Sequence, residues 1–223
     1  MHGAGGGGWE WAIWARVFAA AGFVVAAPDL RPVADGTERT RFEDYLAQVG
    51  DAVEAMARPR VLIGASLGGL LAAKSSEFAD ALIVVNSLPP SPWHQRLPTR
   101  SAYPALIPWR REASLAGTRR AMPDVDEAAC LFAFRHWRDE AGAVLNVARE
   151  GVHVAVPTVP TLVMASELDE DIPIDVSTAL AAHWRADVVR LPGASHVGAL
   201  LGRTASSIAA QAVAWLNGLR PAA

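Results

Sequence analysis

The chain has little of several residue types that define common protein classes. Its single cysteine, Cys130, can form no disulfide within the chain and cannot supply a thiolate metal cluster. No uninterrupted apolar run reaches the roughly 18 residues of a membrane span. The first residues have neither the basic start nor the apolar core of a secretory signal. We therefore expect a reducing, cytoplasmic setting.

An excess of charge of one sign is also missing. Twenty basic residues, of which only Lys74 is a lysine, face 23 acidic ones, and no block of like charge stands out. We therefore expect a small molecule, and neither a nucleic acid nor a membrane, as the partner. The 52% hydrophobic and 19% charged composition excludes intrinsic disorder. A length of 223 residues suits one domain with a small insertion.

Short apolar runs alternate with amphipathic helical patterns along most of the chain. This alternation predicts an α/β fold, with a mostly parallel sheet flanked by helices on both faces. The expected strands are Phe23–Ala27, Val61–Ile63, Ala81–Val85, Thr161–Ala165 and Val188–Leu191. The expected helices are Trp9–Ala21, Phe42–Met56, Leu67–Phe78, Asp126–Glu150, Val176–Arg185 and Val197–Leu219. The segment from Pro89 to Pro160 begins with many prolines and reads as an irregular insertion.

The strongest local pattern is G-x-S-x-G over residues 64–68, between an expected strand and an expected helix. Such a turn holds the serine in a strained conformation and exposes its hydroxyl at the strand's carboxyl end. It also aims the Leu67 N–H and the positive helix end at a group bound to Ser66. The pattern therefore predicts Ser66 as a nucleophile, although a structural glycine turn with an incidental serine has the same sequence.

A nucleophilic serine needs a base and an acid that orients the base. His196 follows an expected strand on a loop, where its ring is free to reach over the sheet edge. The acid should follow the strand that ends at Ala165, where Glu167, Asp169 and Asp171 all remain possible from the residues alone. The chain order nucleophile, acid, base is associated with one fold in particular.

These motifs together resemble the α/β-hydrolase superfamily over nearly the whole chain. His2–Gly6 is similar to its oxyanion loop, residues 64–69 to its nucleophile turn, and residues 193–196 to its histidine loop. The resemblance implies a catalytic set of Ser66, Asp169 and His196, and Asp169 is selected because Pro173 follows it by four residues. The backbone N–H groups of Ala4 and Leu67 are implied as the oxyanion donors. No metal or organic cofactor is implied.

One departure from the family pattern concerns the amino terminus. In the family a strand directly precedes the His-Gly loop and lies inside the sheet, whereas here only Met1 precedes His2. Without that strand, Phe23–Ala27 and Val61–Ile63 would face a gap with unpaired backbone groups. We therefore expect an N-terminally truncated form of the fold, in which Met1 is the last residue of the strand. The alternative is that the two strands pair directly.

The same glycines permit a second interpretation. Gly3, Gly5 and Gly8 fit the spacing of a dinucleotide-binding fingerprint, and Asp29 follows Gly8 by 21 residues. The required preceding strand is absent here, and four consecutive glycines satisfy almost any glycine pattern. We keep dinucleotide binding as the more remote hypothesis.

Residues 89–157 occupy the place where the resembled family inserts a cap, so that residues 1–88 and 158–223 would form the core. Within the insertion, Trp93 and Trp109 are the aromatic residues expected to line an apolar pocket above Ser66. The resemblance implies a serine hydrolase that cleaves a small, mainly apolar carboxylic ester, thioester or lactone through an acyl-enzyme on Ser66. A lyase, a carbon–carbon bond hydrolase or a non-catalytic ligand-binding member of the fold remain alternatives.

Overall fold

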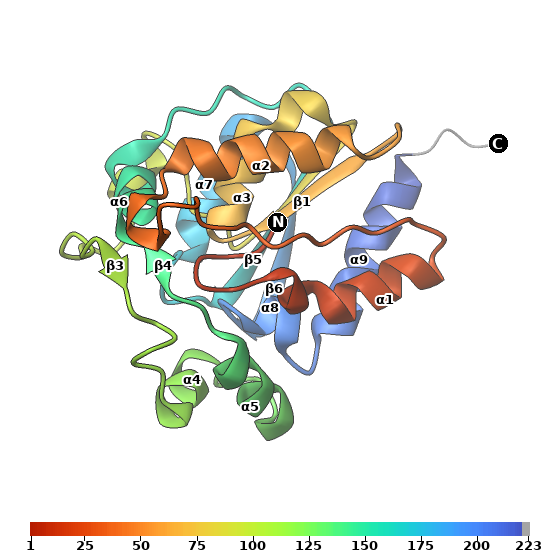
Figure 1. The fold of residues 1–223 in the computed structure, drawn as a ribbon. Helices are drawn as coiled ribbons and strands as arrows, with labels where there is room; N and C mark the ends of the chain where they lie inside the picture. The colour runs from red at the N-terminus through yellow and green to blue at the C-terminus, as the bar shows by residue number, and fades with distance from the viewer. Residues whose placement is uncertain (220–223) are drawn as a thin grey trace.

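A four-stranded parallel sheet forms the centre of the protein (Figure 1). The computed structural model describes residues 1–219. The strand order is β1 (Val61–Ala65), β2 (Ala81–Val85), β5 (Thr161–Leu168) and β6 (Asp187–Ser195). Each neighbouring pair is parallel. The carboxyl ends of all four strands therefore meet at one edge, where ligands bind in open α/β sheets.

Helices cover both faces of this sheet (Figure 1). One face carries α2 (Phe42–Glu54), α3 (Leu67–Lys74) and α7 (Ile174–Trp184), and the other carries α1 (Ala12–Ala20), α8 (Gly198–Leu201) and α9 (Ala205–Gly218). Two apolar clusters fill the layers, one containing Val49, Leu70 and Leu180 and the other Phe18, Ile83 and Ala209. The predicted α/β fold with a parallel sheet between helices is confirmed.

Several helix boundaries differ from the sequence prediction. The helix expected over Val197–Leu219 is two helices, because the chain turns out of the helical conformation at Gly202. The helix expected over Leu67–Phe78 ends at Lys74 and continues only as the 3₁₀ turn η3 (Ser76–Phe78). Similar 3₁₀ turns are η1 (Gly8–Trp11), η2 (Thr37–Arg39) and η4 (Trp93–Arg96).

The segment between β2 and β5 holds a small antiparallel pair and three helices. They are β3 (Leu106–Ile107), α4 (Leu115–Ala121), α5 (Glu127–His136), β4 (Glu140–Ala141) and α6 (Gly142–Gly151). In Figure 1, α4 and α5 project from the body, whereas α6 lies beside α2. The single helix expected over Asp126–Glu150 is therefore wrong. The helix is interrupted between His136 and Gly142. In this interval the buried carboxylate of Glu140 accepts hydrogen bonds from the Gly5 N–H and the Tyr45 hydroxyl.

The strand expected over Phe23–Ala27 is also wrong. The segment is extended but is not part of the sheet, and Val24 is 86% exposed. An apolar run predicts a buried strand only where a neighbouring strand supplies hydrogen bonds and a helix layer covers the side chains. At this place β1 is the last strand of the sheet. Direct pairing of the two segments is therefore not observed.

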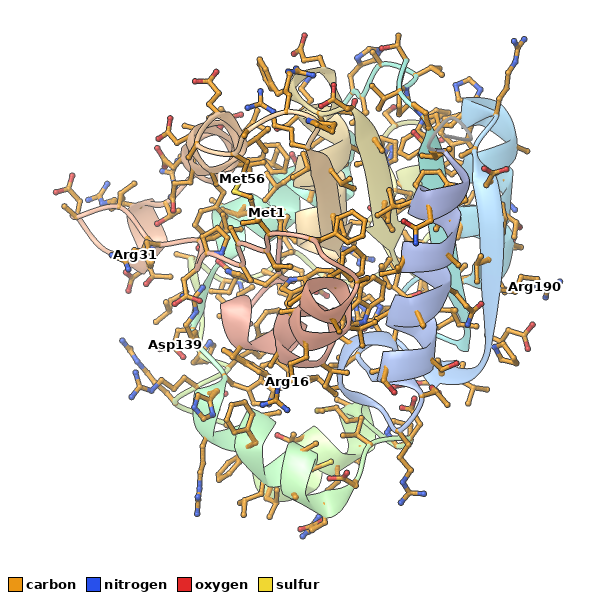
Figure 2. The ribbon with its side chains drawn as sticks, turned by 90° about the vertical axis from the view of Figure 1, so that its right-hand side faces the viewer. Met1, Arg16, Arg31, Met56, Asp139 and Arg190 are labelled. Carbon is orange, nitrogen blue, oxygen red and sulfur yellow. The ribbon has the colours of Figure 1, made fainter. Side chains whose placement is uncertain are left out.

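Met1 lies against the free edge of β1. Its amino group donates to the Ile63 carbonyl, and the Ala65 N–H donates to the Met1 carbonyl at 3.0 Å. The gap expected between residues 23–27 and residues 61–63 is a groove of about 750 Å³. Apolar side chains line it, among them Trp14, Phe18 and Met56. Figure 2 shows Met1 and Met56 on this side of the molecule. Met1 thus holds the loop that follows it against the end of β1.

None of the helices in residues 1–219 combines the length and the apolar character that crossing a membrane requires.

Candidate active site

Ser66 lies in a sharp turn between β1 and α3. Its backbone has φ 53° and ψ −121°, a region that non-glycine residues rarely adopt. The turn is fixed by the Ser66 N–H, which donates to the Val85 carbonyl at 3.1 Å, and by the Ser66 carbonyl, which accepts from the Leu88 N–H at 3.0 Å. The strained turn predicted from residues 64–68 is therefore present, at the carboxyl edge of the sheet.

Two glycines make this turn possible. A Cβ at position 64 would lie 2.1 Å from the Gly68 carbonyl oxygen, and a Cβ at position 68 would lie 2.3 Å from the His2 carbonyl oxygen. Both contacts are with backbone, which cannot move aside as a side chain can. The glycines of the motif therefore let the strand, the helix and the amino-terminal loop pack against one another around Ser66.

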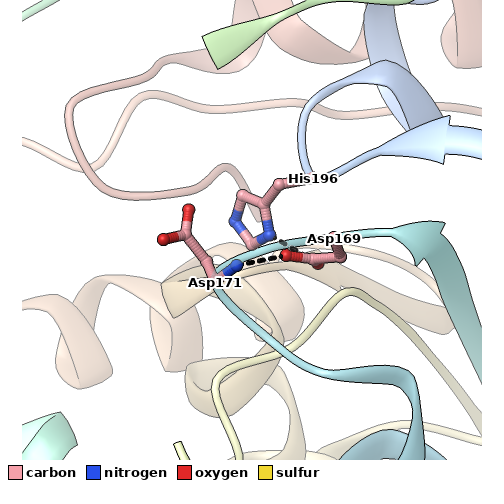
Figure 3. Close-up of side chains that lie close together, drawn as sticks. All are labelled: Asp169, Asp171 and His196. Carbon is pink, nitrogen blue, oxygen red and sulfur yellow. Dashed lines mark hydrogen bonds and ion pairs between the residues drawn. The ribbon is translucent and has the colours of Figure 1, made fainter. Parts of the chain in front are cut away.

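His196 and Asp169 meet at the ends of β6 and β5 (Figure 3). The His196 Nδ1 lies 2.7 Å from Asp169 Oδ2. The other carboxylate oxygen, Oδ1, accepts from the N–H groups of Asp171 and Ile172, both at 2.9 Å. The Asp169 side chain is 1% exposed. The carboxylate is therefore held from both sides. By accepting a hydrogen bond from Nδ1 it orients the imidazole ring of His196, and Nε2 is left free to take a proton.

The other two acids on this turn are paired with arginines. Glu167 forms an ion pair with Arg190 at 3.2 Å, and Asp171 forms one with Arg100. The structure thus places Asp169, of the three candidates, beside the imidazole. Asp169, Asp171 and His196 are also the one group of described residues whose side-chain atoms lie close enough together to hold a metal ion. In this structure His196 Nδ1 and Asp169 Oδ2 are joined to each other by a hydrogen bond.

The charge state of His196 is set by two opposing effects. Burial lowers its pKa, but the hydrogen bond and the negative charge of Asp169 outweigh the burial, and Asp171 and Glu10 add to them. The net result is a pKa above the usual value of 6.5. A raised pKa makes the ring a better proton acceptor.

The loop over residues 2–6 lies directly above Ser66. His2 is buried, and its Nε2 accepts from the Leu30 N–H at 2.8 Å, so that Nδ1 carries the proton and donates to the Gly3 carbonyl. Burial lowers the His2 pKa to about 4, which keeps the ring neutral. Within residues 1–219 the N–H groups of Ala4 and Leu67 have no hydrogen-bond acceptor. These two donors therefore remain available to a bound group.

A cavity of about 680 Å³ opens over Ser66. Ala4, Ser66 and His196 form part of its wall. Its apolar lining comes from Tyr103, Ile107, Trp109, Leu145, Ile172 and Leu200. Trp109 lines the cavity, as expected from the sequence, but Trp93 does not. Trp93 packs against His183, with ring centroids 4.5 Å apart, because η4 lies over α7 and faces away from the cavity.

Within the described residues, no hydrogen bond joins the Ser66 hydroxyl to His196. Both side chains line the same cavity, and catalytic hydrogen bonds in unliganded sites are often long and tighten when substrate binds.

Three polar residues that support this site were not predicted from the sequence. Asn86, directly after β2, donates from Nδ2 to the Ser166 hydroxyl and to the His196 carbonyl, both at 2.8 Å. Asp124 accepts from the Ser195 N–H at 3.1 Å. Glu10 accepts from the Gly3 N–H at 3.1 Å. A polar residue next to a buried strand was the available signal for Asn86. Asp124 and Glu10 carry no such signal, because their partners are distant in sequence or belong to a glycine loop.

The glycines at positions 3–8 belong to this site and not to a dinucleotide fingerprint. A Cβ at Gly3 would lie 3.3 Å from the Ser66 Cβ, and the Gly8 N–H donates to the Asp29 carboxylate at 2.7 Å.

A strained serine at a strand-to-helix turn, beside a histidine held by a buried aspartate, defines an enzyme of hydrolase type. The family model described as "Alpha/beta hydrolase family" matches residues 1–206, and the chain belongs to this family. A search of the curated proteins finds no match.

Solved structures with the same fold include three enzymes. Polyneuridine aldehyde esterase is 17% identical, with a TM-score of 0.72 over 95% of this chain and 96% of that chain. Tomato methylketone synthase I in complex with 2-tridecanone is 14% identical, with a TM-score of 0.76 over 99% and 97%. A pyrethroid hydrolase from Sphingobium faniae is 19% identical, with a TM-score of 0.73 over 98% and 96%. At these identities the likeness shows the fold.

Proposed function

We propose that the protein is a serine hydrolase that cleaves a small, mainly apolar carboxylic ester, thioester or lactone. The observation that carries the proposal is the 2.7 Å contact between His196 Nδ1 and the buried Asp169, in a ring that shares a cavity with Ser66. A histidine oriented in this way beside a strained serine is the arrangement that activates a hydroxyl for attack on a carbonyl.

In the first half of the reaction, the Ser66 hydroxyl attacks the carbonyl carbon while His196 Nε2 takes its proton. The tetrahedral oxyanion accepts hydrogen bonds from the N–H groups of Ala4 and Leu67. One such donor is worth about 3–4 kcal/mol of the barrier in measured cases. The intermediate collapses, the bond from the carbonyl carbon to the leaving oxygen or sulfur breaks, and His196 gives the proton to that departing alkoxide or thiolate.

In the second half, a water molecule attacks the acyl-enzyme, and His196 again accepts the proton. Collapse of the second tetrahedral intermediate frees the carboxylic acid and restores the Ser66 hydroxyl. Asp169 fixes the ring orientation and stabilises the imidazolium that forms in each half. This sequence needs only the side chains and backbone groups described above, together with one water molecule.

The proposed substrate class follows from the cavity wall. Tyr103, Ile107, Trp109 and Leu145, all from the segment between β2 and β5, line the space above Ser66. We propose that residues 89–157 act as a cap and that residues 1–88 and 158–223 form the core beneath it. An apolar enclosure of about 680 Å³ suits a small molecule. Two of the similar structures are named as an esterase and a pyrethroid hydrolase, which agrees with ester cleavage.

A fluorophosphonate probe tests the proposal. We expect it to label wild-type protein at Ser66 and to leave Ser66→Ala unlabelled. Ser206→Ala, which removes an exposed hydroxyl from α9, is the matched control and should label like the wild type. Folded wild-type protein that neither labels nor hydrolyses short-chain p-nitrophenyl esters would overturn the proposal in favour of a ligand-binding member. Labelling without turnover of any ester would favour a lyase or a carbon–carbon bond hydrolase.

A further inference from the structure

Glu10 is a buried carboxyl group in the wall of the catalytic cavity for which the mechanism above has no use. It is 4% exposed and lines the cavity together with Ser66 and His196. Buried carboxyl groups are rare unless they are paired, because removing an ionised group from water is costly. No ion pair of Glu10 with an arginine or lysine exists among residues 1–219. The group therefore calls for a functional explanation.

The contacts of Glu10 place it beneath the loop that carries the Ala4 N–H. Its Oε2 accepts from the Gly3 N–H at 3.1 Å. A Cβ built at Gly6 would lie only 2.0 Å from Oε1, so that the carboxyl group packs directly on the backbone of Gly6. The Gly6 N–H in turn donates to the Gly3 carbonyl at 3.2 Å, which closes the turn around Ala4. Glu10 thus holds both ends of the turn that presents the second oxyanion donor.

The carboxyl group is also close to the nucleophile. A Cβ built at Gly3 would lie 3.9 Å from Glu10 Oε2 and 3.3 Å from the Ser66 Cβ, so that both side chains lie next to this glycine. A full negative charge here would lie several ångströms from the oxyanion of the tetrahedral intermediate. Because the Glu10 side chain is buried, the repulsion between these two charges is screened less than it would be in water.

The titratable and charged groups that face Glu10 are few. They are the amino group of Met1, the ring of His196 and the guanidinium group of Arg138, while α8 contributes only apolar residues and glycine. Glu140 holds the Gly5 N–H of the same loop. Burial is the largest effect and raises the Glu10 pKa to about 7, although the Gly3 N–H and the nearby positive groups oppose it. The negative charge of Glu10 also helps to raise the His196 pKa.

We propose that Glu10 is a positioning residue of the oxyanion loop whose protonation state controls the rate. The protonated carboxyl group holds the Gly3–Gly6 turn and permits the oxyanion to form, whereas the ionised carboxylate opposes it. This inference rests on the proposed serine hydrolase function.

A consequence concerns the pair formed by Glu10 and His196. The working form has a neutral His196 and a protonated Glu10. Moving one proton from Glu10 to His196 gives an idle form with the same total number of protons, in which the imidazolium cannot accept the serine proton and the carboxylate opposes the oxyanion. The attraction between the two opposite charges stabilises this idle form. Removing the Glu10 charge should therefore shift both limbs of the pH–rate profile.

The test is the pH dependence of Ser66 reactivity in Glu10→Gln, measured between pH 5 and 9.5 as kcat/KM for a p-nitrophenyl ester and as the rate of fluorophosphonate labelling. Glutamine keeps an oxygen that can accept from the Gly3 N–H but carries no charge. We expect the wild-type rate to fall above pH 7–8 by roughly tenfold or more, the order expected for one charge at this separation. In Glu10→Gln this fall should disappear, and the rising limb assigned to His196 should move to lower pH.

Glu54→Gln, which neutralises an exposed glutamate at the end of α2, is the matched control and should keep both wild-type limbs. Circular dichroism at each pH shows whether the protein is folded. If Glu10→Gln keeps the wild-type falling limb, or if the wild-type rate is constant up to pH 9.5, the inference is overturned. A wild type that is folded but never labels would instead overturn the proposed function.

A second measurement does not require the variant to fold or the enzyme to turn over. Carbon-13 NMR of wild-type protein labelled at the glutamate carboxyl carbons should show one carboxyl group that titrates near pH 7. If every glutamate titrates below about pH 5.5, Glu10 is ionised throughout the working range, and the inference fails whatever the outcome of the labelling experiment.

Discussion

The side-chain amide of Asn86 donates a hydrogen bond to the backbone carbonyl of His196 at 2.8 Å, across 110 residues of sequence. The same amide donates to the Ser166 hydroxyl, and its oxygen accepts from the Ser166 N–H, both at 2.8 Å. Asn86 thus ties the end of β2 to the end of β5 and to the histidine loop. It adopts φ 47°, a left-handed conformation that asparagine tolerates better than most residues. The position of His196 above the sheet therefore depends on a residue that never reaches the cavity.

Asn86→Asp should lower kcat by about tenfold or more with little change in KM. Aspartate tolerates the same backbone conformation but has no donor for the His196 carbonyl, so that the ring is held less well while the apolar cavity is unchanged. Steady-state kinetics on a short-chain ester measures the split. Asn217→Asp, on the exposed face of α9, is the control. An unchanged kcat would show that the histidine loop needs no support from β2.

Asp169→Asn should lower kcat by roughly three to four orders of magnitude, which is the order of the loss when the aspartate of a serine protease triad is changed to asparagine. The amide cannot stabilise the imidazolium and favours the wrong tautomer. Glu167→Gln removes an acid from the same turn, but one that pairs with Arg190, and should act like the wild type. Equal losses in the two variants would argue against a specific role for Asp169.

The rising limb of the wild-type pH–rate profile should have its midpoint above pH 6.5. His196 must be neutral to accept the serine proton, and Asp169 raises its pKa above that value. Asp169→Asn should move the midpoint to lower pH, because it removes the charge that favours the imidazolium. A profile that is flat from pH 5 to 9 would contradict the assignment of His196 as the base.

The free energy of unfolding should fall between about pH 4.5 and pH 7 more steeply in wild-type protein than in Glu10→Gln. The Glu10 pKa is raised from 4.5 to about 7 in the folded state, so that in this window the folded state holds a proton that the unfolded state has released. Stability then declines as pH rises, by up to the order of 3 kcal/mol for this one group. Urea unfolding at pH 5 and pH 8 measures the difference, and parallel curves for the two proteins would contradict it.

Trp109→Ala should raise KM for apolar esters several-fold, whereas Trp93→Ala should leave KM unchanged and lower the melting temperature. Trp109 lines the cavity above Ser66, but Trp93 packs against His183 outside it. Truncating a packed tryptophan costs about 3–5 kcal/mol when it is fully buried, and less for partly buried Trp93. Kinetics and thermal unfolding of both variants separate the two roles. A KM effect in Trp93→Ala would place η4 nearer to the substrate than the structure does.

Local pattern was enough to predict the fold class and the residues at the strand ends. Ser66, Asp169 and His196 each follow a strand whose apolar run is visible in the sequence, and parallel strands bring their carboxyl ends to one edge. The turn at Ser66 was also predictable, because Gly64 and Gly68 are required by contacts within one strand–turn–helix unit. Such features depend on residues that are neighbours in the sequence, and they can therefore be predicted from the sequence pattern.

Only the tertiary structure decided the remainder. Phe23–Ala27 has the composition of a strand but lies outside the sheet, because strand formation also depends on which segment folds against it. Glu167, Asp169 and Asp171 all remained possible from the residues alone, and only the family resemblance favoured Asp169; in the structure Asp169 is the one hydrogen-bonded to His196. Glu10, Asn86 and Asp124 act on groups brought close by folding. A side chain's role at this site follows from what lies within a few ångströms of it, and in most of these cases the chain alone does not record that proximity.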